Sequence, residues 1–291
     1  MKSSNIGGQA VMEGVMMRNA DKYAVAVRKT DGEIVVKTEE YKGIVQNKKI
    51  RSLPIIRGVF SFIDSMVLGM STLTYSASFF MDEEEEEKDE KKESVMMGLT
   101  IACSVVMAVA IFMILPYFLS QLFRKFTDST TLITLLEGAV RLVIFFGYIL
   151  LISRMKDIQR VFMYHGAEHK CINCIEHGME LNVENVLKSS RLHKRCGTSF
   201  LFIVMIVSII FFLFIRIESP IWRVVFRLLL IPVIAGVSFE FIRLAGKSEN
   251  KLVILLSKPG MMLQKLTTRE PDASMAEVAI ASVEAVLPLR Q

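Results

Sequence analysis

Residues 94–123 read SVMMGLTIACSVVMAVAIFMILPYFLSQLF, thirty consecutive positions without an acidic or basic side chain. A helix of about 20 apolar residues is long enough to cross the hydrocarbon core of a bilayer. This stretch therefore predicts a transmembrane helix. Hydrophobic residues make up 52% of the 291-residue chain. That share excludes a small soluble domain, a disordered chain and a disulfide-rich secreted scaffold.

Further apolar segments predict a mainly α polytopic membrane protein with about four transmembrane helices. The other crossings are expected at residues 132–153, 197–215 and 222–244. Residues 53–81 are also apolar, but Arg57, Asp64 and Thr72 recur near helical spacing and form one polar stripe. Such a helix is typical of the membrane interface, or of packing against other helices.

The distribution of charge predicts the topology. Residues 1–93 contain fourteen Lys and Arg and residues 154–196 contain eight, whereas 124–131 contain two. Basic residues concentrate in cytoplasmic loops, so both termini and the 154–196 loop are expected in the cytosol of a bacterial inner membrane. Because the basic residues flank apolar segments, we expect contact with the lipid bilayer and no binding to nucleic acid. The acidic run 82–93 predicts a solvated linker.

The polar ends of the chain predict a small cytosolic cap. Alternating residues 23–27 and 33–38 flank the turn Thr30-Asp31-Gly32 and predict a β-hairpin. Asp272 can cap an amphipathic helix over residues 273–286. The expected organisation is a Gly-rich segment with the hairpin (1–52), an interfacial helix (53–81), the linker (82–93), two crossings (94–153), a cytosolic loop (154–196), two crossings (197–244) and a cytosolic C-terminal segment (245–291).

All four histidines and three of the four cysteines lie between positions 165 and 196. His165 and His169 are four residues apart, so on a helix both imidazoles project from one face and can share a metal ion. Glu168 is close enough to act as a ligand or as a general base. The cluster predicts a site for a divalent metal, zinc or iron.

Two ligand sets are compatible with this spacing. In the first, Cys171, Cys174, His193 and Cys196 form a closed structural zinc knuckle. In the second, His165 and His169 belong to an inverted zincin pattern, His-x-x-Glu-His, and one coordination position stays open for water. The first set predicts a structural site and the second an enzyme.

Four motifs identify a family. They are GGQAVMEGVMMR (7–18), YHGAEHK (164–170), HKRCGTSF (193–200) and LTTREPD (266–272). With them the chain resembles, over nearly its whole length, the YqhQ-like family of uncharacterised bacterial membrane proteins. The resemblance implies a metal-dependent enzyme and emphasises six positions, without requiring cysteines at 171 and 174, so it favours the open set. These positions are His165, Glu168, His169, Glu176, His193 and Cys196.

These observations lead to one expected function and two alternatives. The expected function is a metal-dependent hydrolase of a membrane lipid or peptide, in which His165, His169, His193 and Cys196 bind the metal and Glu168 or Glu13 moves protons. Glu176, Cys171 and Cys174 are additional candidate ligands, and a homo-oligomer is compatible with this architecture. The first alternative is a non-catalytic scaffold whose structural metal site supports binding of a cytosolic partner. The second is a thiol redox protein that uses Cys171 and Cys174.

Overall fold

Four antiparallel strands form a sheet near the N-terminus, with spatial order β1-β2-β3-β4. They are β1 (Ile6–Val11), β2 (Gly14–Asn19), β3 (Lys22–Arg28) and β4 (Ile34–Glu40). The predicted hairpin is confirmed as β3 and β4, and Gly32 takes a φ of +89° in its turn. The sheet is larger than predicted, because the Gly-rich segment forms β1 and β2, a second hairpin.

The computed structural model describes residues 4, 6–80, 90–215, 217, 219–248 and 250–287. The chain divides into two compact units. The sheet unit comprises Met1–Phe80, Ile152–Val204 and Ala235–Gln291, and the helical unit comprises Met81–Leu151 and Met205–Ile234. Most of the predicted acidic linker, residues 82–89, lies outside the described residues. The fold is thus mainly α with an N-terminal antiparallel sheet, as predicted.

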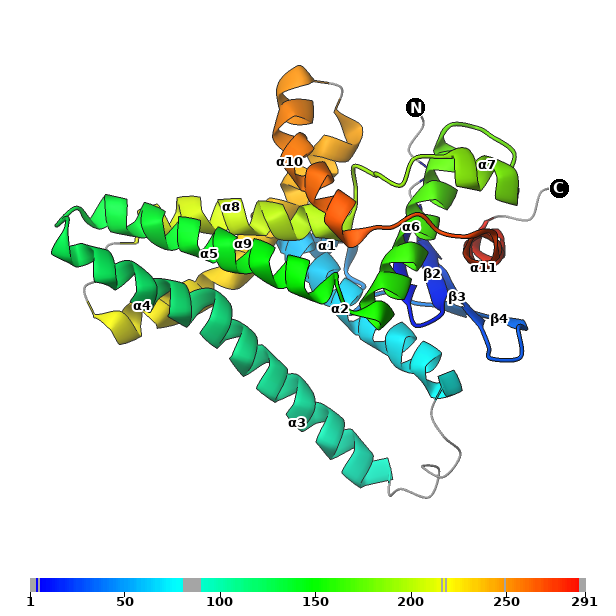
Figure 1. Cartoon of the computed structure of the whole chain (residues 1–291), viewed down its shortest axis with the longest axis horizontal. Helices are drawn as coiled ribbons and strands as arrows, with labels where there is room; N and C mark the ends of the chain where they lie inside the picture. The colour runs from blue at the N-terminus through cyan, green and yellow to red at the C-terminus, as the bar shows by residue number, and fades with distance from the viewer. Residues whose placement is uncertain are drawn as a thin grey trace. The chain divides into compact units, whose positions relative to one another are not determined.

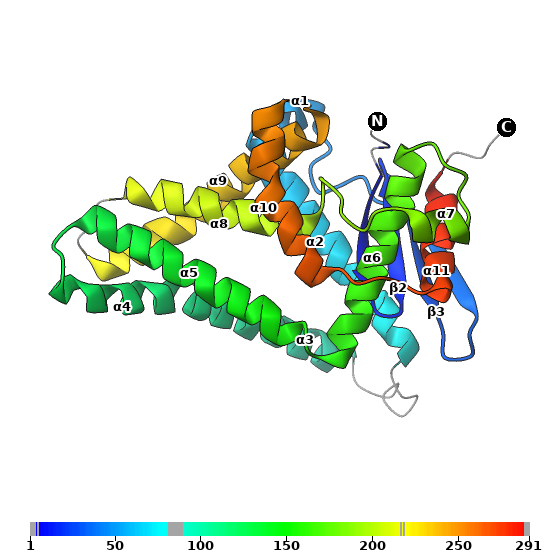
Figure 2. The ribbon, with the colours of Figure 1, turned by 45° about the horizontal axis from the view of Figure 1, so that its top comes forward.

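Within the sheet unit, helices cover both faces of the sheet. Helices α6 (Lys156–Glu176) and α11 (Ala273–Val286) pack on the face that carries Val15 and Ala24. Figures 1 and 2 both show these helices beside the strands. The opposite face, with Val25, contacts Leu68 of α2 (Ile56–Ala77). Both faces are buried, so Tyr23–Val27 of β3 is apolar throughout, and its alternation is one of large and small side chains rather than of apolar and polar ones.

Helix α2 turns its polar stripe toward the protein. Asp64 accepts hydrogen bonds from the Ile44 N–H (2.8 Å) and the Tyr41 hydroxyl (3.1 Å), and Ser76 Oγ accepts one from the Met12 N–H (3.1 Å). The exposed side is apolar and includes Ile63, Met66, Val67, Met70 and Leu73. This arrangement is typical of a helix with one side in contact with lipid and the other in contact with protein.

The remaining helices complete the two units. The sheet unit contains α1 (Lys48–Ser52), α7 (Val183–Lys188), α10 (Lys251–Thr267) and the 3₁₀ turn Ser78–Phe80. The helical unit contains α3 (Glu90–Val109), a π-helical turn (Ala110–Ile114), α4 (Leu115–Gln121), a 3₁₀ turn (Leu122–Lys125) and most of α5 (Thr130–Ile152). Helices α8 (Gly197–Leu213) and α9 (Pro220–Lys247) run through both units. The predicted helix after Asp272 is confirmed as α11, because the Asp272 carboxylate accepts the Met275 N–H at 2.9 Å.

Four helices in the described part of the chain are long and apolar enough to cross a membrane: Ile56–Phe80, Val95–Lys125, Thr130–Ile152 and Pro220–Gly246. The number of candidate crossings agrees with the prediction, but the candidates include α2 in place of the segment 197–215. The segment predicted at 197–215 ends its helix at Leu213 after 17 residues, whereas α2 with its 3₁₀ end reaches 25 residues. At 1.5 Å per residue, the shorter helix spans roughly 25 Å, less than the roughly 30 Å of a typical hydrocarbon core.

The helical unit buries three charged side chains together. Glu137 accepts hydrogen bonds from Arg141 Nη2 (2.8 Å) and Arg227 Nη2 (2.9 Å), and all three residues are at most 3% exposed. Arg141 Nε also donates to the Phe112 carbonyl in the π-helical turn (2.9 Å). Glu137 and Arg141 are four residues apart on α5 and share one helix face, and Arg227 of α9 joins this pair. Mutual pairing is how ionisable groups inside a helix bundle are usually stabilised.

Candidate metal centre

Helix α6 presents His165, Glu168 and His169 on one face. The helix can pack closely at this point because position 166 is glycine: a Cβ there would lie 2.0 Å from the Arg269 carbonyl oxygen. The Arg269 N–H also donates to the Phe162 carbonyl at 2.8 Å. The segment after α10 is therefore held against the helix that carries the histidines, which explains why HGAEH and LTTREPD occur in one chain.

Both histidines are oriented by backbone carbonyls. His165 Nδ1 lies 2.9 Å from the Thr267 carbonyl oxygen, and His169 Nδ1 lies 2.6 Å from that of Arg191. A carbonyl oxygen can only accept, so each Nδ1 must carry the proton and each Nε2 keeps its lone pair. Metal-binding histidines usually show this arrangement, in which the nitrogen that does not bind the metal donates to a carbonyl or carboxylate.

Cys196 completes a group of three candidate ligands. Its Sγ lies 3.2 Å from His165 Nε2, and the ligand atoms of His165, His169 and Cys196 all lie within 4.8 Å of one another. Donor atoms of a tetrahedral zinc site are roughly 3.3–3.8 Å apart, given the usual Zn–N and Zn–S bond lengths. The Thr198 N–H donates to Sγ at 3.3 Å, at the start of α8, where a helix N-terminus favours negative charge. The donor set fits zinc or iron.

The loop that carries Cys196 is held by polar side chains of two helices. Lys170 and Asn173 of α6 donate to four carbonyl oxygens within residues 187–192, at 2.6–3.0 Å. Gln264 of α10 accepts the His193 N–H (2.9 Å) and donates to the His193 carbonyl (2.8 Å). The loop backbone is thus satisfied by the protein, which fixes where Cys196 meets the histidines.

Glu168 is a buried carboxylate without a hydrogen bond in the described part of the chain. It is 5% exposed, and its Oε2 lies 3.8 Å from His165 Nε2 and 3.9 Å from His169 Nε2. Burial raises the pKa of Glu168 to about 7, although the neighbouring His165 opposes this rise. Gly8 of β1 packs on this side chain, because a Cβ at Gly8 would lie 2.7 Å from Glu168 Cγ.

His193 and Glu176 pair with each other beside the group of three ligands. His193 Nε2 lies 3.4 Å from Glu176 Oε2, and its ring centroid is 5.8 Å from that of His169. Burial opposes ionisation of Glu176, but hydrogen bonds from His193 and the Ser4 N–H, with the charge of Arg195, lower its pKa to about 2. Burial also lowers the pKa of His193. Of the four predicted metal ligands, the structure brings together three, and His193 lies at their edge.

Cys171 and Cys174 point into the hydrophobic core instead. Both are fully buried with residues of the sheet and α11, and Cys174 Sγ lies 3.4 Å from the Glu180 carbonyl oxygen. Burial raises the pKa of both thiols, which disfavours the reactive thiolate. Within the described residues, the three-ligand group includes neither cysteine.

Glu13 is engaged elsewhere. It lies in the β1–β2 turn with a φ of +48°, its carboxylate accepts hydrogen bonds from the Arg160 guanidinium, and it lies 3.2 Å from the Tyr164 hydroxyl. Burial and the charge of Glu13 raise the pKa of Tyr164. Glu13 is not among the residues that line the cavity described next. The structure therefore does not bring it to His165 and His169.

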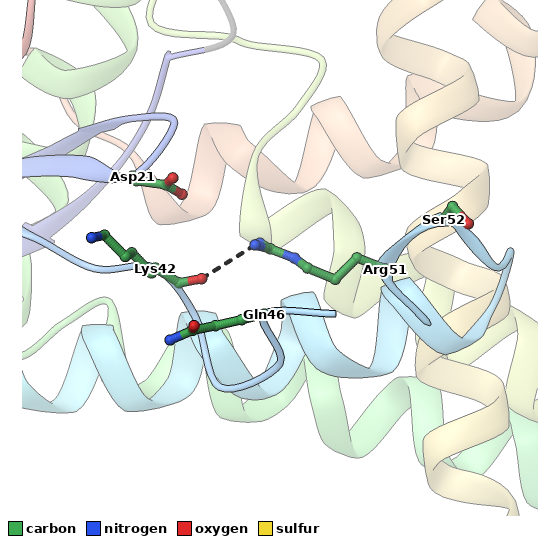
Figure 3. Close-up of a pocket in the computed structure, with 5 residues that line it drawn as sticks. All are labelled: Asp21, Lys42, Gln46, Arg51 and Ser52. Carbon is green, nitrogen blue, oxygen red and sulfur yellow. Dashed lines mark hydrogen bonds between the residues drawn. The ribbon is translucent and has the colours of Figure 1, made fainter. Parts of the chain in front are cut away.

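A cavity of about 780 Å³ opens onto the candidate ligands. Its polar side contains His165, Glu168, His169, His193 and Cys196, and its other walls come from β1, α2, α8 and α9. Ligand pockets are usually about 300–1,000 Å³. A shallower hollow of about 340 Å³ lies elsewhere in the sheet unit (Figure 3), where Arg51 donates to the Lys42 carbonyl at 3.2 Å. That hollow contains none of the predicted site residues.

Three groups that shape the site were not predicted from the sequence. These are the Thr267 and Arg191 carbonyls, which orient the histidines, and Gly8, which makes room for Glu168. Every residue carries a backbone carbonyl, so no residue type could have indicated the first two. Gly8 was visible as part of the GGQAVMEG motif, but its partner was not.

Comparison with known proteins gives two matches. The profile of the family described as "Protein of unknown function (DUF1385)" matches residues 53–289. The "Uncharacterized protein YqhQ" of Bacillus subtilis (strain 168) is 37% identical over 294 residues, which cover 97% of this chain and 92% of that protein. No solved structure matches the chain. The resemblance indicated by the four sequence motifs is confirmed.

Proposed function

Because the chain belongs to the DUF1385 family, whose description assigns no function, we propose one from the site itself: a metal-dependent hydrolase of membrane lipids or membrane peptides. In this proposal His165, His169 and Cys196 hold a zinc or iron ion, and Glu168 is the general base. Glu176 pairs with both His193 and Arg195 at the edge of the site.

The observation that carries the proposal is the environment of Glu168. A buried carboxylate is normally hydrogen-bonded or paired with a cation, because burying it alone is unfavourable. Glu168 instead faces two imidazole nitrogens across 3.8 and 3.9 Å, beside an open cavity. This is the position expected of a group that acts on a molecule bound between it and the ligands.

The three-ligand group also favours catalysis over a purely structural role. Structural zinc sites are closed by four protein ligands, whereas catalytic sites keep one position open. A bound divalent ion would supply Lewis-acid polarisation and a lowered pKa for water at the site. Glu168 would accept the proton of the attacking water and return it to the leaving group. The Thr267 and Arg191 carbonyls would hold the imidazoles in one tautomer throughout.

We propose that this site lies at the cytosolic face of a bacterial inner membrane, with both termini in the cytosol and α2 along the membrane interface. Because β1 and α11 both pack on α6, an even number of crossings must separate each of them from α6, so α3 and α5 form one pair of crossings and α8 and α9 the other. The support is the concentration of basic residues in 1–93 and 154–196. The cavity walls include Phe62, Phe200 and Phe239, which lie on apolar helices. A membrane-embedded or membrane-adjacent substrate could therefore enter without first crossing water.

Metal content of the detergent-purified protein tests the proposal. By inductively coupled plasma mass spectrometry, we expect about one equivalent of zinc or iron per chain, which is lost in His165→Ala/His169→Ala. His177→Ala is the matched control, because His177 is exposed at the C-cap of the same helix and its Nδ1 lies 2.7 Å from the Asn173 carbonyl oxygen, away from the site. Glu168→Gln should keep the metal and lose hydrolysis of acyl-ester and peptide reporter substrates.

Two results would favour the alternatives. Wild-type protein that holds the metal and hydrolyses none of the reporters would indicate a structural metal in a scaffold, and a Glu168→Gln variant as fast as the wild type would exclude Glu168 as the general base. Folded wild-type protein that contains no metal, and still supports growth of cells that depend on it, would refute the metalloenzyme proposal.

A further inference from the structure

The candidate site lies at an open edge of the sheet. Strand β1 pairs only with β2, so its other edge has no neighbouring strand in the described part of the chain. Gly7 and Gly8 are exposed, and Gln9 and Ala10 are half-buried. Residues 6–10 all line the cavity that contains Glu168.

The register shows which backbone groups of β1 point outward. The Arg28 N–H donates to the Glu13 carbonyl (2.9 Å), so odd-numbered residues of β2 face β3 and even-numbered ones face β1. Since Gly14 is opposite Val11, residues 7, 9 and 11 of β1 face β2. The N–H and C=O groups of Gly8 and Ala10 therefore point away from the sheet.

The outward N–H groups at the two ends of β1 have partners, and those between them do not. The Ile6 N–H donates to Ser4 Oγ (3.3 Å), and the Met12 N–H donates to Ser76 Oγ (3.1 Å). Among the described residues, neither Gly8 nor Ala10 has such a partner. An unpaired edge normally invites pairing with another strand. Here the two free positions lie within the cavity, and Gly8 packs directly on Glu168.

The opposite wall of the cavity is apolar. It is formed by Phe62 and Leu68 of α2, Phe200 and Leu201 of α8, and Phe239 of α9. Side chains of a strand alternate between two directions. A strand laid along β1 would direct one set of side chains toward this apolar wall and the other set toward α6 and its histidines.

We propose that the substrate is an extended peptide with apolar side chains, which binds by adding a strand to β1 through the N–H and C=O groups of Gly8 and Ala10. The inference rests on the proposed hydrolase function and narrows its substrate class. Strand addition is a recurring mode of peptide recognition, in which main-chain bonds provide affinity and side-chain pockets provide specificity. An acyl chain would contact the apolar wall, but it has no groups that could pair with the N–H and C=O groups of Gly8 and Ala10. Covering these backbone groups without pairing them is unfavourable.

Three hydroxamates test the proposal on the full-length, zinc-loaded protein in detergent. Acetohydroxamate contains only the metal-binding group, an acetylated leucine-phenylalanine-leucine hydroxamate adds a peptide, and lauroyl hydroxamate adds an acyl chain. We expect the peptide hydroxamate to bind at least about tenfold more tightly than acetohydroxamate or lauroyl hydroxamate. A tenfold gain in affinity is what one or two additional hydrogen bonds provide. Single N-methylation along the peptide should weaken binding with a period of two, because only alternate amides face β1. Methylation of the intervening amides is the matched control.

Hydrogen exchange provides a readout that does not depend on turnover. The segment 6–12 should exchange more slowly with the peptide hydroxamate than with acetohydroxamate. Ala10→Pro removes one outward N–H without breaking a bond to β2, and proline is tolerated on strand edges. This variant should lose about tenfold in peptide affinity and keep its zinc and its affinity for acetohydroxamate.

Each contrary result has a separate meaning. Equal affinity for peptide and acetohydroxamate, or no period of two, would overturn strand addition and leave the metal site intact. Tighter binding of lauroyl hydroxamate than of the peptide hydroxamate would overturn the peptide proposal and show that the substrate is a lipid. Absence of both zinc and acetohydroxamate binding would overturn the proposed function and this inference together.

Discussion

Gly166→Ala should weaken metal binding although residue 166 is not a ligand. The added Cβ would lie 2.0 Å from the Arg269 carbonyl oxygen, a distance that real Cβ atoms do not show. The oxygen belongs to the backbone, so the segment after α10 must move away from α6. Thr267 is two residues earlier in the same segment, and its carbonyl accepts the His165 Nδ1–H at 2.9 Å. The substitution should therefore disturb His165, a candidate ligand, by displacing the Thr267 carbonyl that orients it.

The size of the effect follows from these distances. A shift of about 1.4 Å, from 2.0 to 3.4 Å, restores ordinary contact between the Cβ and the Arg269 oxygen. Carried to Thr267, this shift takes the hydrogen bond of its carbonyl beyond normal reach. Loss of such an orienting bond typically lowers metal affinity by about 10–100-fold. Alanine in place of glycine stabilises a helix by up to about 1 kcal/mol, whereas forcing an extra group into a packed contact costs about 1–3 kcal/mol. We expect the net effect on folding stability to be small or unfavourable.

Competition with a chelator of known zinc affinity measures the change. Gly147→Ala is the matched control, because Gly147 is also helical and nothing lies within 4 Å of its Cβ position. The control should bind zinc like the wild type. Unchanged zinc affinity in Gly166→Ala, in a protein that melts normally, would refute the role assigned to the Thr267 carbonyl.

Three further predictions concern other parts of the molecule. Glu137→Gln leaves two buried guanidinium groups without a carboxylate and should destabilise the protein by about 3–5 kcal/mol in thermal unfolding. Glu184→Gln, which removes an exposed pair with Lys188, should leave the unfolding midpoint unchanged. Cys171→Ala/Cys174→Ala should retain one equivalent of zinc, since both side chains lie in the core, and loss of the metal would show that they are ligands. Asp272→Ala should lower stability by about 1 kcal/mol through loss of the α11 cap, and an unchanged unfolding midpoint would contradict that role.

Much of the fold could be predicted because local patterns determine it. Thirty uncharged residues require a helix long enough for a membrane, since an unpaired backbone is unfavourable in lipid. The turn at Gly32 and the cap at Asp272 are local backbone requirements, and both were found where expected. Strand β1 was missed because its glycines carry no side chain to alternate, and β2 because four of its residues in succession are buried, which removes the alternation that identifies a strand.

At the candidate site, the common helix face of His165, Glu168 and His169 could be predicted from the sequence alone, because helical periodicity places residues three and four apart together. Which distant group joins them depends on the tertiary fold. Cys196 lies beside His165, whereas His193 pairs with Glu176 and Glu13 with Arg160. These contacts depend on the hydrogen bonds that Lys170, Asn173 and Gln264 donate to the loop carbonyls. They also depend on the close packing at Gly8 and Gly166. Such contacts join residues far apart in the chain, and no local spacing encodes them.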